Sequence, residues 1–350
     1  MKSRKVVQRA VVAALLVWCF GLKAQSWAMD WHEYKARFIS QDGRVIDFQQ
    51  RSISHSEGQA YGMLLALFNG DKAGFEKIWA WTRANLQMRK GDRLFCWSWG
   101  KRPNGQWQVI DYNDASDGDI LIGWALYLAW KKWNKAEFRQ EAMEIVSSIR
   151  KELLLYKNGN YLLLPGYFGF AKRDGLTMNP SYFILSAFHD FGALDRPAFW
   201  AKVESSARSL LKRFLLGEWA LPPDWITVKE GEAGIEPDSR GVSFGYDAWR
   251  TFLYAAWARE PCLKRGFEKL YQFFQKNGYL PRKVQMTSGW VSLEPAPAGS
   301  YACLGAYARF LGKRDCAQRL FQMADRKMAR EGENYFSASL YLLAKSVSMP

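Results

Sequence analysis

The sequence predicts one all-α domain built from pairs of helices. Apolar stretches with helical spacing recur along the 350-residue chain, and Gly, Asn or Pro joins several of them. From Trp249, apolar residues recur at i, i+3, i+4, i+7 and i+8, which is the spacing of one helix face. Residues 120–130 are apolar almost all round, as is typical of a helix that protein covers on every side. The pattern therefore favours a helical domain with some of its helices at the centre.

Helix pairs would fill the chain from residue 29 onwards. Six pairs would take about 54 residues each, which fits two helices and their connections. No sequence repeat of that period is evident, so the pattern predicts the fold class and no particular closure. Short β segments are expected near 159–164 and 279–295, where turn residues surround Gly-Asn-Tyr and Gly-Trp-Val. The other helices are expected at 58–69, 72–87, 137–154, 181–192, 197–215, 263–277, 300–311 and 314–329.

The first 28 residues predict a secretory signal peptide. Cations precede an apolar run at 10–22, which is too short to span a bilayer. Ser26 and Ala28 place small residues at two positions typical of a cleavage site before Met29. We therefore expect a periplasmic or secreted protein whose single domain spans residues 29–350.

The composition excludes several classes of protein. The chain is 49% hydrophobic and 24% charged, so neither a disordered chain nor a multi-span membrane protein fits. Its net charge of +15 falls to +10 without residues 1–28, which contain five cations and no acids. A basic exported protein favours contact with anionic surfaces such as lipid headgroups or envelope polymers, unless the charge serves solubility alone. We expect a monomer and no nucleic-acid partner.

Many chemistries have no support in the sequence. The three histidines lack metal-ligand spacing and no Cys-x-x-Cys pair occurs, so a zinc site is not expected. Carboxylates beside aromatic residues remain, and they suit carbohydrate: aromatic faces stack on sugar rings, and two carboxyl groups can cleave a glycosidic bond. An oxidising compartment would permit disulfides without the sequence fixing any pairing among Cys96, Cys262, Cys303 and Cys316.

Glu57 is the first candidate site residue, in the segment 56–63 (SEGQAYGM). Ser54 and Glu57 stand three apart before an apolar run, which is also the pattern of a helix capping box. In the functional interpretation, Glu57 enters a cleft at a helix start, with Tyr61 one turn later on the same face. Glycines at 58 and 62 would let a ligand or another backbone approach closely.

Asp117 is the second candidate, in the acidic segment 113–119 (NDASDGD) before the apolar run at 120–130. A calcium loop of the EF-hand type is excluded, because its twelfth position would be Trp124. Helix capping is an open alternative, since Asp and Ser accept hydrogen bonds from the first amides of a helix. Unpaired charges at the edge of a core are costly, which favours a functional site.

Asp247 and Arg250 form the third candidate, since they stand three apart and share a helix face. A surface ion pair is the alternative, but Tyr246 and Trp249 are poor surroundings for a solvated pair. Each of several aromatic residues could bind sugar or belong to the core. These residues are Trp97, Trp99, Trp107, Tyr182 and Trp225.

Four segments in order resemble glycoside hydrolase family 8, most closely the exported endoglucanases that accompany bacterial cellulose synthases. They are 56–63, 115–119 (ASDGD), 179–182 (NPSY) and 246–250 (YDAWR). The resemblance covers essentially all of 29–350, with one small departure at Gly123, where the family usually has Ala. It implies an (α/α)6 barrel with an open cleft, an inverting endo-β-1,4-glucanase acting on cellulose-type glucan, and no metal or organic cofactor.

The resemblance also implies a role for each matching residue. Glu57 matches the general acid, Asp247 the general base, and Asp117 the carboxylate that holds the sugar at the cleavage subsite. Inversion needs a water between base and sugar, so the two carboxyl groups should stand roughly 6.5–9.5 Å apart. Substrate contacts are expected from Tyr61, Trp97, Trp99, Tyr182, Tyr246 and Arg250.

Two other interpretations stay open. A lyase for an anionic polysaccharide would suit the basic chain, but the scarcity of histidine gives it little support. A non-catalytic glucan-binding component of the export machinery is the other, and three acids beside aromatic residues argue against it. The expected partners are β-1,4-glucan chains and the cellulose synthase and export complex.

Overall fold

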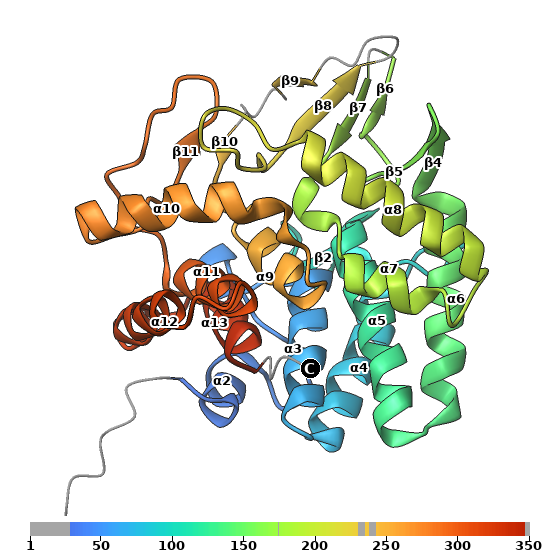
Figure 1. The fold of residues 1–350 in the computed structure, drawn as a ribbon. Helices are drawn as coiled ribbons and strands as arrows, with labels where there is room; N and C mark the ends of the chain where they lie inside the picture. Colours follow the sequence, from blue (N-terminus) through green and yellow to red (C-terminus); the bar gives the residue numbers. More distant parts are fainter. Residues whose placement is uncertain (1–28, 174, 230–234, 238–242, 347–350) are drawn as a thin grey trace, which may run out of the picture.

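In the computed structural model, helices alternate along the chain between the outside and the inside of a closed ring (Figure 1). The structure describes residues 29–173, 175–229, 235–237 and 243–346. Each inner helix packs against the next, and the last inner helix packs back against the first, which closes the ring. The inner helices are α3 (Ser56–Phe68), α5 (Ser116–Trp133), α7 (Leu185–Phe191), α9 (Arg250–Trp257), α11 (Ala298–Phe310) and α13 (Tyr335–Ser346). The outer helices are α2 (Trp31–Phe38), α4 (Lys72–Leu86), α6 (Ala136–Glu152), α8 (Pro197–Arg213), α10 (Lys264–Asn277) and α12 (Arg314–Met328).

The sequence sets which helices lie inside. In α11 every residue from Ala298 to Ala308 is buried, because the helix is apolar or small on all sides. Its outer neighbour α12 buries one face only, at positions such as Leu320 and Ala324, and exposes its charged residues. The described residues thus form six outer and inner helix pairs, which confirms the (α/α)6 barrel that the resemblance implied.

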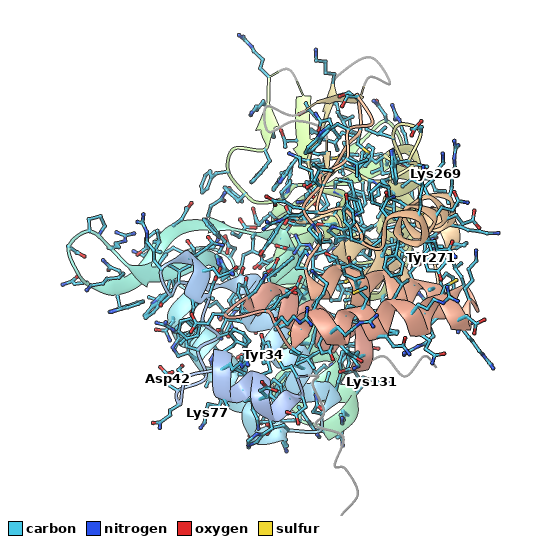
Figure 2. The ribbon with its side chains drawn as sticks, turned by 90° about the vertical axis from the view of Figure 1, so that its left-hand side faces the viewer. Tyr34, Asp42, Lys77, Lys131, Lys269 and Tyr271 are labelled. Carbon is cyan, nitrogen blue, oxygen red and sulfur yellow. The ribbon has the colours of Figure 1, made fainter. Side chains whose placement is uncertain are left out.

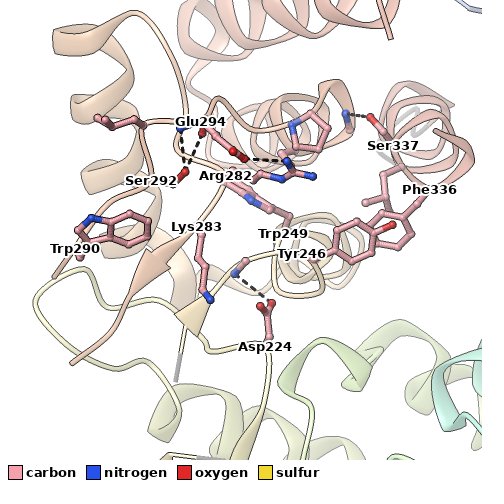
Figure 3. Close-up of a pocket in the computed structure, with 16 residues that line it drawn as sticks. Asp224, Tyr246, Trp249, Arg282, Lys283, Trp290, Ser292, Glu294, Phe336 and Ser337 are labelled. Carbon is pink, nitrogen blue, oxygen red and sulfur yellow. Dashed lines mark hydrogen bonds and ion pairs between the residues drawn. The ribbon is translucent and has the colours of Figure 1, made fainter. Parts of the chain in front are cut away.

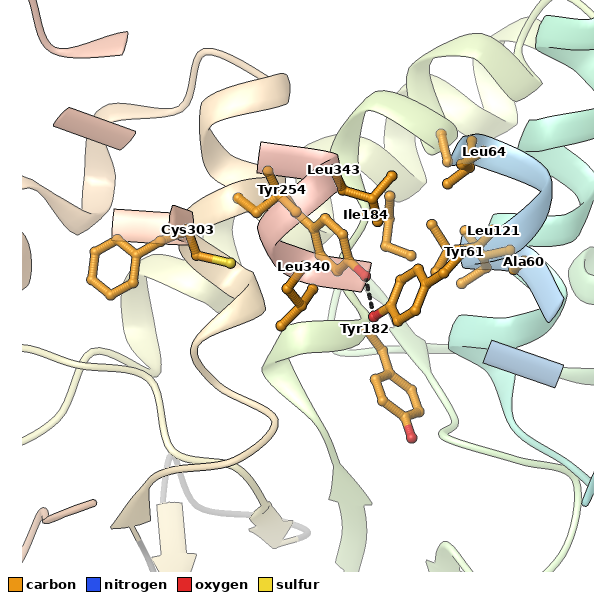
Figure 4. Packing of buried hydrophobic residues seen from close by; sticks show 14 of the residues in the cluster. Ala60, Tyr61, Leu64, Leu121, Tyr182, Ile184, Tyr254, Cys303, Leu340 and Leu343 are labelled. Carbon is orange, nitrogen blue, oxygen red and sulfur yellow. Dashed lines mark hydrogen bonds between the residues drawn. The ribbon is translucent and has the colours of Figure 1, made fainter. Parts of the chain in front are cut away.

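Side chains from several inner helices meet at the centre of the ring. Figure 4 shows Tyr61 of α3, Tyr254 of α9 and Leu340 of α13 converging there. The hydroxyl groups of Tyr61 and Tyr254 share a hydrogen bond of 3.0 Å, which satisfies both polar groups in the core.

Most predicted helices are confirmed within a few residues, and the exceptions have physical causes. The helix expected at 181–192 is a 3-10 turn (Pro180–Tyr182) followed by the short α7. The sequence pattern missed α13 because it is buried on all sides from Tyr335 to Ala344, so it lacks the polar face that makes a helix recognisable. It also missed α2, which is only eight residues long.

Strands lead into the inner helices that bear the candidate acids. β1 (Ser54–His55) runs directly into α3, β3 (Trp107–Asp114) ends just before α5, and β10 (Ser243–Phe244) precedes α9. β2 (Cys96–Lys101) pairs with both β1 and β3 in an antiparallel sheet, and the β2–β3 hairpin stands out from the body at the left of Figure 2. These connections place three helix N-termini at one end of the ring.

The remaining strands form small antiparallel sheets. The strand expected near 159–164 is confirmed as β5 (Asn160–Leu163), which pairs with β4 (Leu154–Lys157). At 279–295 the structure has only β11 (Val284–Gln285), paired with β10, and isolated bridges. The other sheet contains β6 (Ala171–Lys172), β7 (Gly175–Met178), β8 (Ile226–Lys229) and β9 (Ile235–Pro237).

The predicted signal peptide at 1–28 lies outside the described residues. Within the described part of the chain, no helix is long and apolar enough to cross a membrane. Cys96, Cys262, Cys303 and Cys316 are described, and none of them forms a disulfide in this structure.

Candidate active site

Arg250, the first residue of α9, joins the three predicted acids. Its Nη1 donates hydrogen bonds to Glu57 Oε2 and, at 2.8 Å, to Asp117 Oδ2. Its Nη2 lies 3.5 Å from Asp247 Oδ1. Residues from three separate inner helices or their approaches therefore converge on one guanidinium, which brings together the three candidate acids.

A glycine allows two of these acids to approach each other. Glu57 and Asp117 are the second residues of α3 and α5, and the two helices begin side by side. A Cβ atom on Gly118 would lie 2.2 Å from Ser56 Oγ and 3.0 Å from the backbone nitrogen of Glu57. Any larger residue at position 118 would push the helix starts apart, and so separate the two carboxylates.

The guanidinium is buried and fixed on every side. Arg250 is 1% exposed, and its Nε donates a hydrogen bond of 3.0 Å to Ser181 Oγ. Its Nη1 also reaches the Tyr61 hydroxyl at 3.3 Å, and its charge lies 5.1 Å from the centre of the Tyr182 ring. A buried cation without acidic partners would be costly, so Arg250 and the acids stabilise each other.

Burial dominates the protonation of Glu57. The side chain is 16% exposed, and burial raises the pKa of Glu57 to about 8. The Arg250 charge opposes this rise, the charges of Asp117 and Asp247 add to it, and the Tyr335 hydroxyl, 3.2 Å from Oε1, opposes it again. A carboxyl group with this pKa holds its proton near neutral pH, which is what a proton donor requires.

The other two acids have different surroundings. Asp117 is 2% exposed, and both of its oxygens are bonded: Oδ2 to Arg250, and Oδ1 to the backbone N–H of Gly118 at 2.9 Å. Burial raises the pKa of Asp117, although Arg250 opposes the rise. Asp247 is 22% exposed, and its Oδ2 accepts a hydrogen bond of 3.0 Å from Asn179 Nδ2. Glu57 and Asp247 are therefore the more accessible members of the group.

Neither the capping box at α3 nor the surface ion pair between Asp247 and Arg250 forms in this structure. No capping box forms at α3: His55 occupies the N-cap position, and Ser54 Oγ has no hydrogen-bond partner among the residues that the structure describes. The N-cap residue of α5 is Ala115, which makes no side-chain capping bond, and Asp117 accepts one first-turn N–H, from Gly118, while its other oxygen binds Arg250. The burial of Arg250 excludes a surface ion pair with Asp247.

Tyr61 is buried beside the guanidinium. It has no exposed surface in this structure, its hydroxyl contacts Tyr254 and Arg250, and the substrate contact expected of it stays a prediction. Tyr182 is also largely buried, with its ring against Arg250 and edge-on to Trp225. Both tyrosines support the guanidinium that holds the acids. Contacts of Tyr182, Arg250 and Asp117 with a sugar stay predictions.

The tryptophans of β2 have unequal surroundings. The Trp97 ring stacks on His55 at 5.7 Å, and His55 stacks in turn on Tyr335, the residue that donates to Glu57. Trp99 instead packs against Trp81, Trp107 and the Arg44 guanidinium, so its ring is largely covered. Trp107 is the exposed member of that second group, and it offers the more accessible platform.

Tyr246 is half exposed, and it stands beside a pocket of about 620 Å³ (Figure 3). Its ring stacks on Phe336 with 4.4 Å between centroids. Asp224, Lys283 and Trp290 also line this pocket. No cluster of His, Cys, Asp or Glu suited to a metal ion occurs among the described residues.

Sequence reasoning missed three residues at this site. Tyr335 and Phe336 begin α13, where they contact Glu57 and Tyr246. Asp224 lies in a loop and accepts hydrogen bonds from the backbone beside Asp247. The two adjacent aromatic residues at the start of α13 could have indicated a sugar-binding segment. Nothing in the sequence around Asp224 distinguishes it from an ordinary loop aspartate.

Comparison with known proteins identifies the family of this chain. The model of the glycosyl hydrolases family 8 matches residues 5–349. A probable endoglucanase from Novacetimonas hansenii is 34% identical over 324 residues, which cover 91% of this chain and 89% of the relative. An endoglucanase from Escherichia coli K12 is 32% identical over 293 residues, which cover 81% of this chain and 78% of the relative.

Crystal structures of relatives share the barrel. Endoglucanase Cel10 from Klebsiella pneumoniae superposes with a TM-score of 0.78 at 31% identity, over 90% of this chain and 97% of that one. The endo-β-1,4-glucanase CMCax from Acetobacter xylinum gives a TM-score of 0.77 at 31% identity, over 92% of this chain and 97% of that one. The family match, the sequence identities and the shared barrel agree: the chain belongs to glycoside hydrolase family 8.

Proposed function

We propose that this protein is an inverting endo-β-1,4-glucanase that hydrolyses internal bonds of cellulose-type glucan. The observation that supports this most is the convergence of Glu57, Asp117 and Asp247 on Arg250, with Glu57 protonated near neutral pH. Relatives named as endoglucanases give the substrate class.

The proposed reaction is a single displacement. Glu57 donates its proton to the glycosidic oxygen as the bond to the anomeric carbon breaks. Asp247 accepts a proton from a water molecule, whose oxygen attacks that carbon from the opposite face of the ring. The oxygen of water forms the new bond, and the sugar released as leaving group takes the proton from Glu57.

The surrounding residues would prepare this step. Arg250 holds all three carboxylates, so their relative positions are set before substrate binds. The exposed ring of Tyr246 beside the active acids suits stacking against a sugar face, and Trp107 suits a more distant sugar. Asp117 is proposed to support the sugar at the cleavage point, through a hydroxyl contact or through Arg250.

We expect the purified protein to release reducing ends from soluble carboxymethyl cellulose while the viscosity of the solution falls early, as internal cleavage requires. A lyase would instead produce unsaturated uronides from an anionic polysaccharide. A binding component would retain glucan without turnover. Absence of reducing-end release from any β-1,4-glucan would contradict the proposed function.

The proposal extends to the setting of this activity. A signal peptide at 1–28 would export the protein to the periplasm or beyond, where residues 29–350 act as the catalytic domain. The resemblance of the four sequence segments to endoglucanases that accompany cellulose synthases supports a role in trimming or releasing chains during cellulose export. A monomer bound transiently by the synthase complex would suffice for that role.

The substitution Asp117→Asn should move the alkaline limb of the pH profile to lower pH. The Asp117 charge raises the pKa of Glu57, so its removal lets Glu57 lose its proton more readily. The wild-type limb of kcat/KM should fall with a midpoint at about pH 8, since Glu57 must be protonated to act. Profiles of kcat/KM from pH 5 to 9 give the midpoint of the alkaline limb for wild type and for Asp117→Asn. The midpoint does not depend on how much the maximal rate has fallen.

Tyr335→Phe provides the matched control, because its expected shift has the opposite sign. The Tyr335 hydroxyl donates to Glu57 and favours its ionised form, so removing it should raise the pKa of Glu57. The alkaline limb should then move to higher pH. Limbs that move in the same direction in both variants would show that Glu57 does not set the alkaline limb.

A further inference from the structure

A second aspartate, Asp224, binds the backbone on both sides of Asp247. Asp224 lies between Pro223 and Trp225, in the loop before β8. Its Oδ1 accepts hydrogen bonds from two backbone N–H groups, at 3.2 Å from Gly245 and at 2.8 Å from Ala248. Its own N–H donates to the carbonyl oxygen of Ser243 at 2.7 Å. Three hydrogen bonds thus fasten this loop along 243–248, and Figure 3 shows the one that Gly245 donates to Asp224.

Asp247 lies between the two amides that Asp224 binds. The bonded N–H groups belong to residues two before and one after Asp247, so one carboxylate oxygen fixes both ends of the turn that contains it. α9 begins at Arg250 and holds only the carbonyl side of this turn: the N–H groups of Arg250 and Thr251 donate to the carbonyl oxygens of Asp247 at 3.3 Å and Ala248 at 3.0 Å. Asp224 therefore holds the N–H side of the turn that contains Asp247.

Gly245 permits this close contact. A Cβ atom on Gly245 would lie 2.6 Å from Asp224 Oδ2, which is too close for two heavy atoms that are not bonded. Glycine at this position is therefore explained by the aspartate beneath it. The same contact supplies a second way to disturb Asp224 without changing Asp224 itself.

The electrostatics of Asp224 agree with a role next to a charged base. Burial raises the pKa of Asp224 to about 7, and the charge of Asp247 adds to this rise. Backbone amides of Ala248, Gly245 and Asp247 oppose it, which shows how closely the carboxyl group is surrounded by this turn. An acid that only held a loop far from Asp247 would not have the Asp247 charge beside it.

We propose that Asp224 is a positioning residue for the general base: through the amides of Gly245 and Ala248 it holds the turn that directs the Asp247 carboxylate at the attacking water. The inference rests on the proposed function, in which Asp247 is the base. It predicts that the contribution of Asp224 depends on its hydrogen-bond acceptor, not on direct contact with glucan. A displacement of about 1 Å at a reacting group can cost around 100-fold in rate.

The test compares Asp224→Ala, Asp224→Asn and Gly245→Ala with wild type on carboxymethyl cellulose and on a dinitrophenyl cello-oligosaccharide. Asp224→Ala should lower kcat about tenfold or more while KM changes less than about threefold. Asp224→Asn keeps an acceptor oxygen and should recover most of kcat. Gly245→Ala, which displaces the carboxyl group, should resemble Asp224→Ala. Both substrates should be affected equally, because each needs the base whatever its leaving group.

Asp71 offers a matched control in an outer helix. It accepts the Gly74 N–H at 2.9 Å, and a Cβ on Gly74 would lie 2.6 Å from Asp71 Oδ2, so its contact with glycine resembles that of Asp224 with Gly245, while its other bonds come from Trp31 and Lys35. Asp71→Ala should lower the melting temperature and leave kcat within about twofold.

Three results would overturn the inference while wild type remains active: unchanged kcat in Asp224→Ala, an equal loss in Asp71→Ala, or no recovery in Asp224→Asn. An inactive wild type would instead contradict the proposed function.

Discussion

Glu57→Gln should lower kcat on unactivated β-1,4-glucan by about 100-fold to 10,000-fold, which is the usual contribution of a general acid. The amide has nearly the same shape as the carboxyl group, and its oxygen can still accept a hydrogen bond from Arg250 or Tyr335. It has no proton to give to the glycosidic oxygen. Turnover on carboxymethyl cellulose, with folding checked by circular dichroism, measures the loss.

The leaving group separates this loss from a general disturbance of the site. A dinitrophenolate group departs without protonation, so Glu57→Gln should lose far less activity on a dinitrophenyl cello-oligosaccharide than on glucan. Glu141→Gln is the matched control, since Glu141 is 15% exposed and is also paired with arginine, through Arg83 and Arg93. It should keep kcat within about twofold. Equal losses of Glu57→Gln on both substrates would remove Glu57 from the role of acid.

The same variant has an expected effect on stability with a defined sign. The pKa of Glu57 is about 8 in the folded chain and near its ordinary value of 4.5 when unfolded. Between these values the folded state binds more protons, so the stability that Glu57 contributes falls as pH rises from 4.5 to 8. Glu57→Gln removes that loss, so its melting temperature relative to wild type should rise over this range. A helix cap would have predicted a loss of about 1 kcal/mol instead.

Asp247→Asn should lower kcat by a similar factor, and on every substrate. The amide oxygen can still accept the hydrogen bond from Asn179, so the turn should stay folded, but an amide cannot take a proton from water. The base is needed whatever group leaves, so the dinitrophenyl substrate should lose as much as glucan does. Parallel measurements of kcat on the two substrates check this.

A second substitution at the same position gives an independent check. Asp247→Ala opens space on the face opposite the leaving group, and azide placed there should attack the anomeric carbon and restore turnover, giving an α-glycosyl azide. Asp195→Asn is the matched control, because Asp195 is similarly buried and is paired with Arg150. It should lose little kcat. Retained activity in Asp247→Asn would show that another group is the base.

The sequence singled out Asp117 and Asp247 because each stands in surroundings that are unusual for a solvated acid, and the family resemblance supplied their roles and that of Glu57. Asp117 precedes a run of apolar residues, where an unpaired charge would be costly, and the structure gives it Arg250 as partner. Asp247 and Arg250 were predicted to share a helix face; they do lie together, but Asp247 lies in the turn before α9 and not in the helix. The helical class followed from apolar periodicity, which sets the face that each helix buries.

Other features could not be read from local spacing. Tyr335 and Phe336 reach Glu57 and Tyr246 only because the last inner helix packs against the first, and periodicity does not show how a ring closes. Tyr61 was predicted on the correct helix face, but one turn is about 5.4 Å further along the axis, so it lies buried behind Glu57, where its hydroxyl contacts Arg250. Asp224 sits in a loop and acts through backbone amides, which leave no pattern in side chains.

The configuration of the first product tests the central claim most directly. Wild-type protein is mixed with a soluble cello-oligosaccharide in an NMR tube, and the anomeric protons of the new reducing end are followed before mutarotation is complete. Protonation by Glu57 with attack of a water activated by Asp247 predicts that the α-anomer appears first and the β-anomer only later. Initial appearance of the β-anomer would mean a covalent intermediate and two displacements, and it would contradict the assignment of Asp247 as the base.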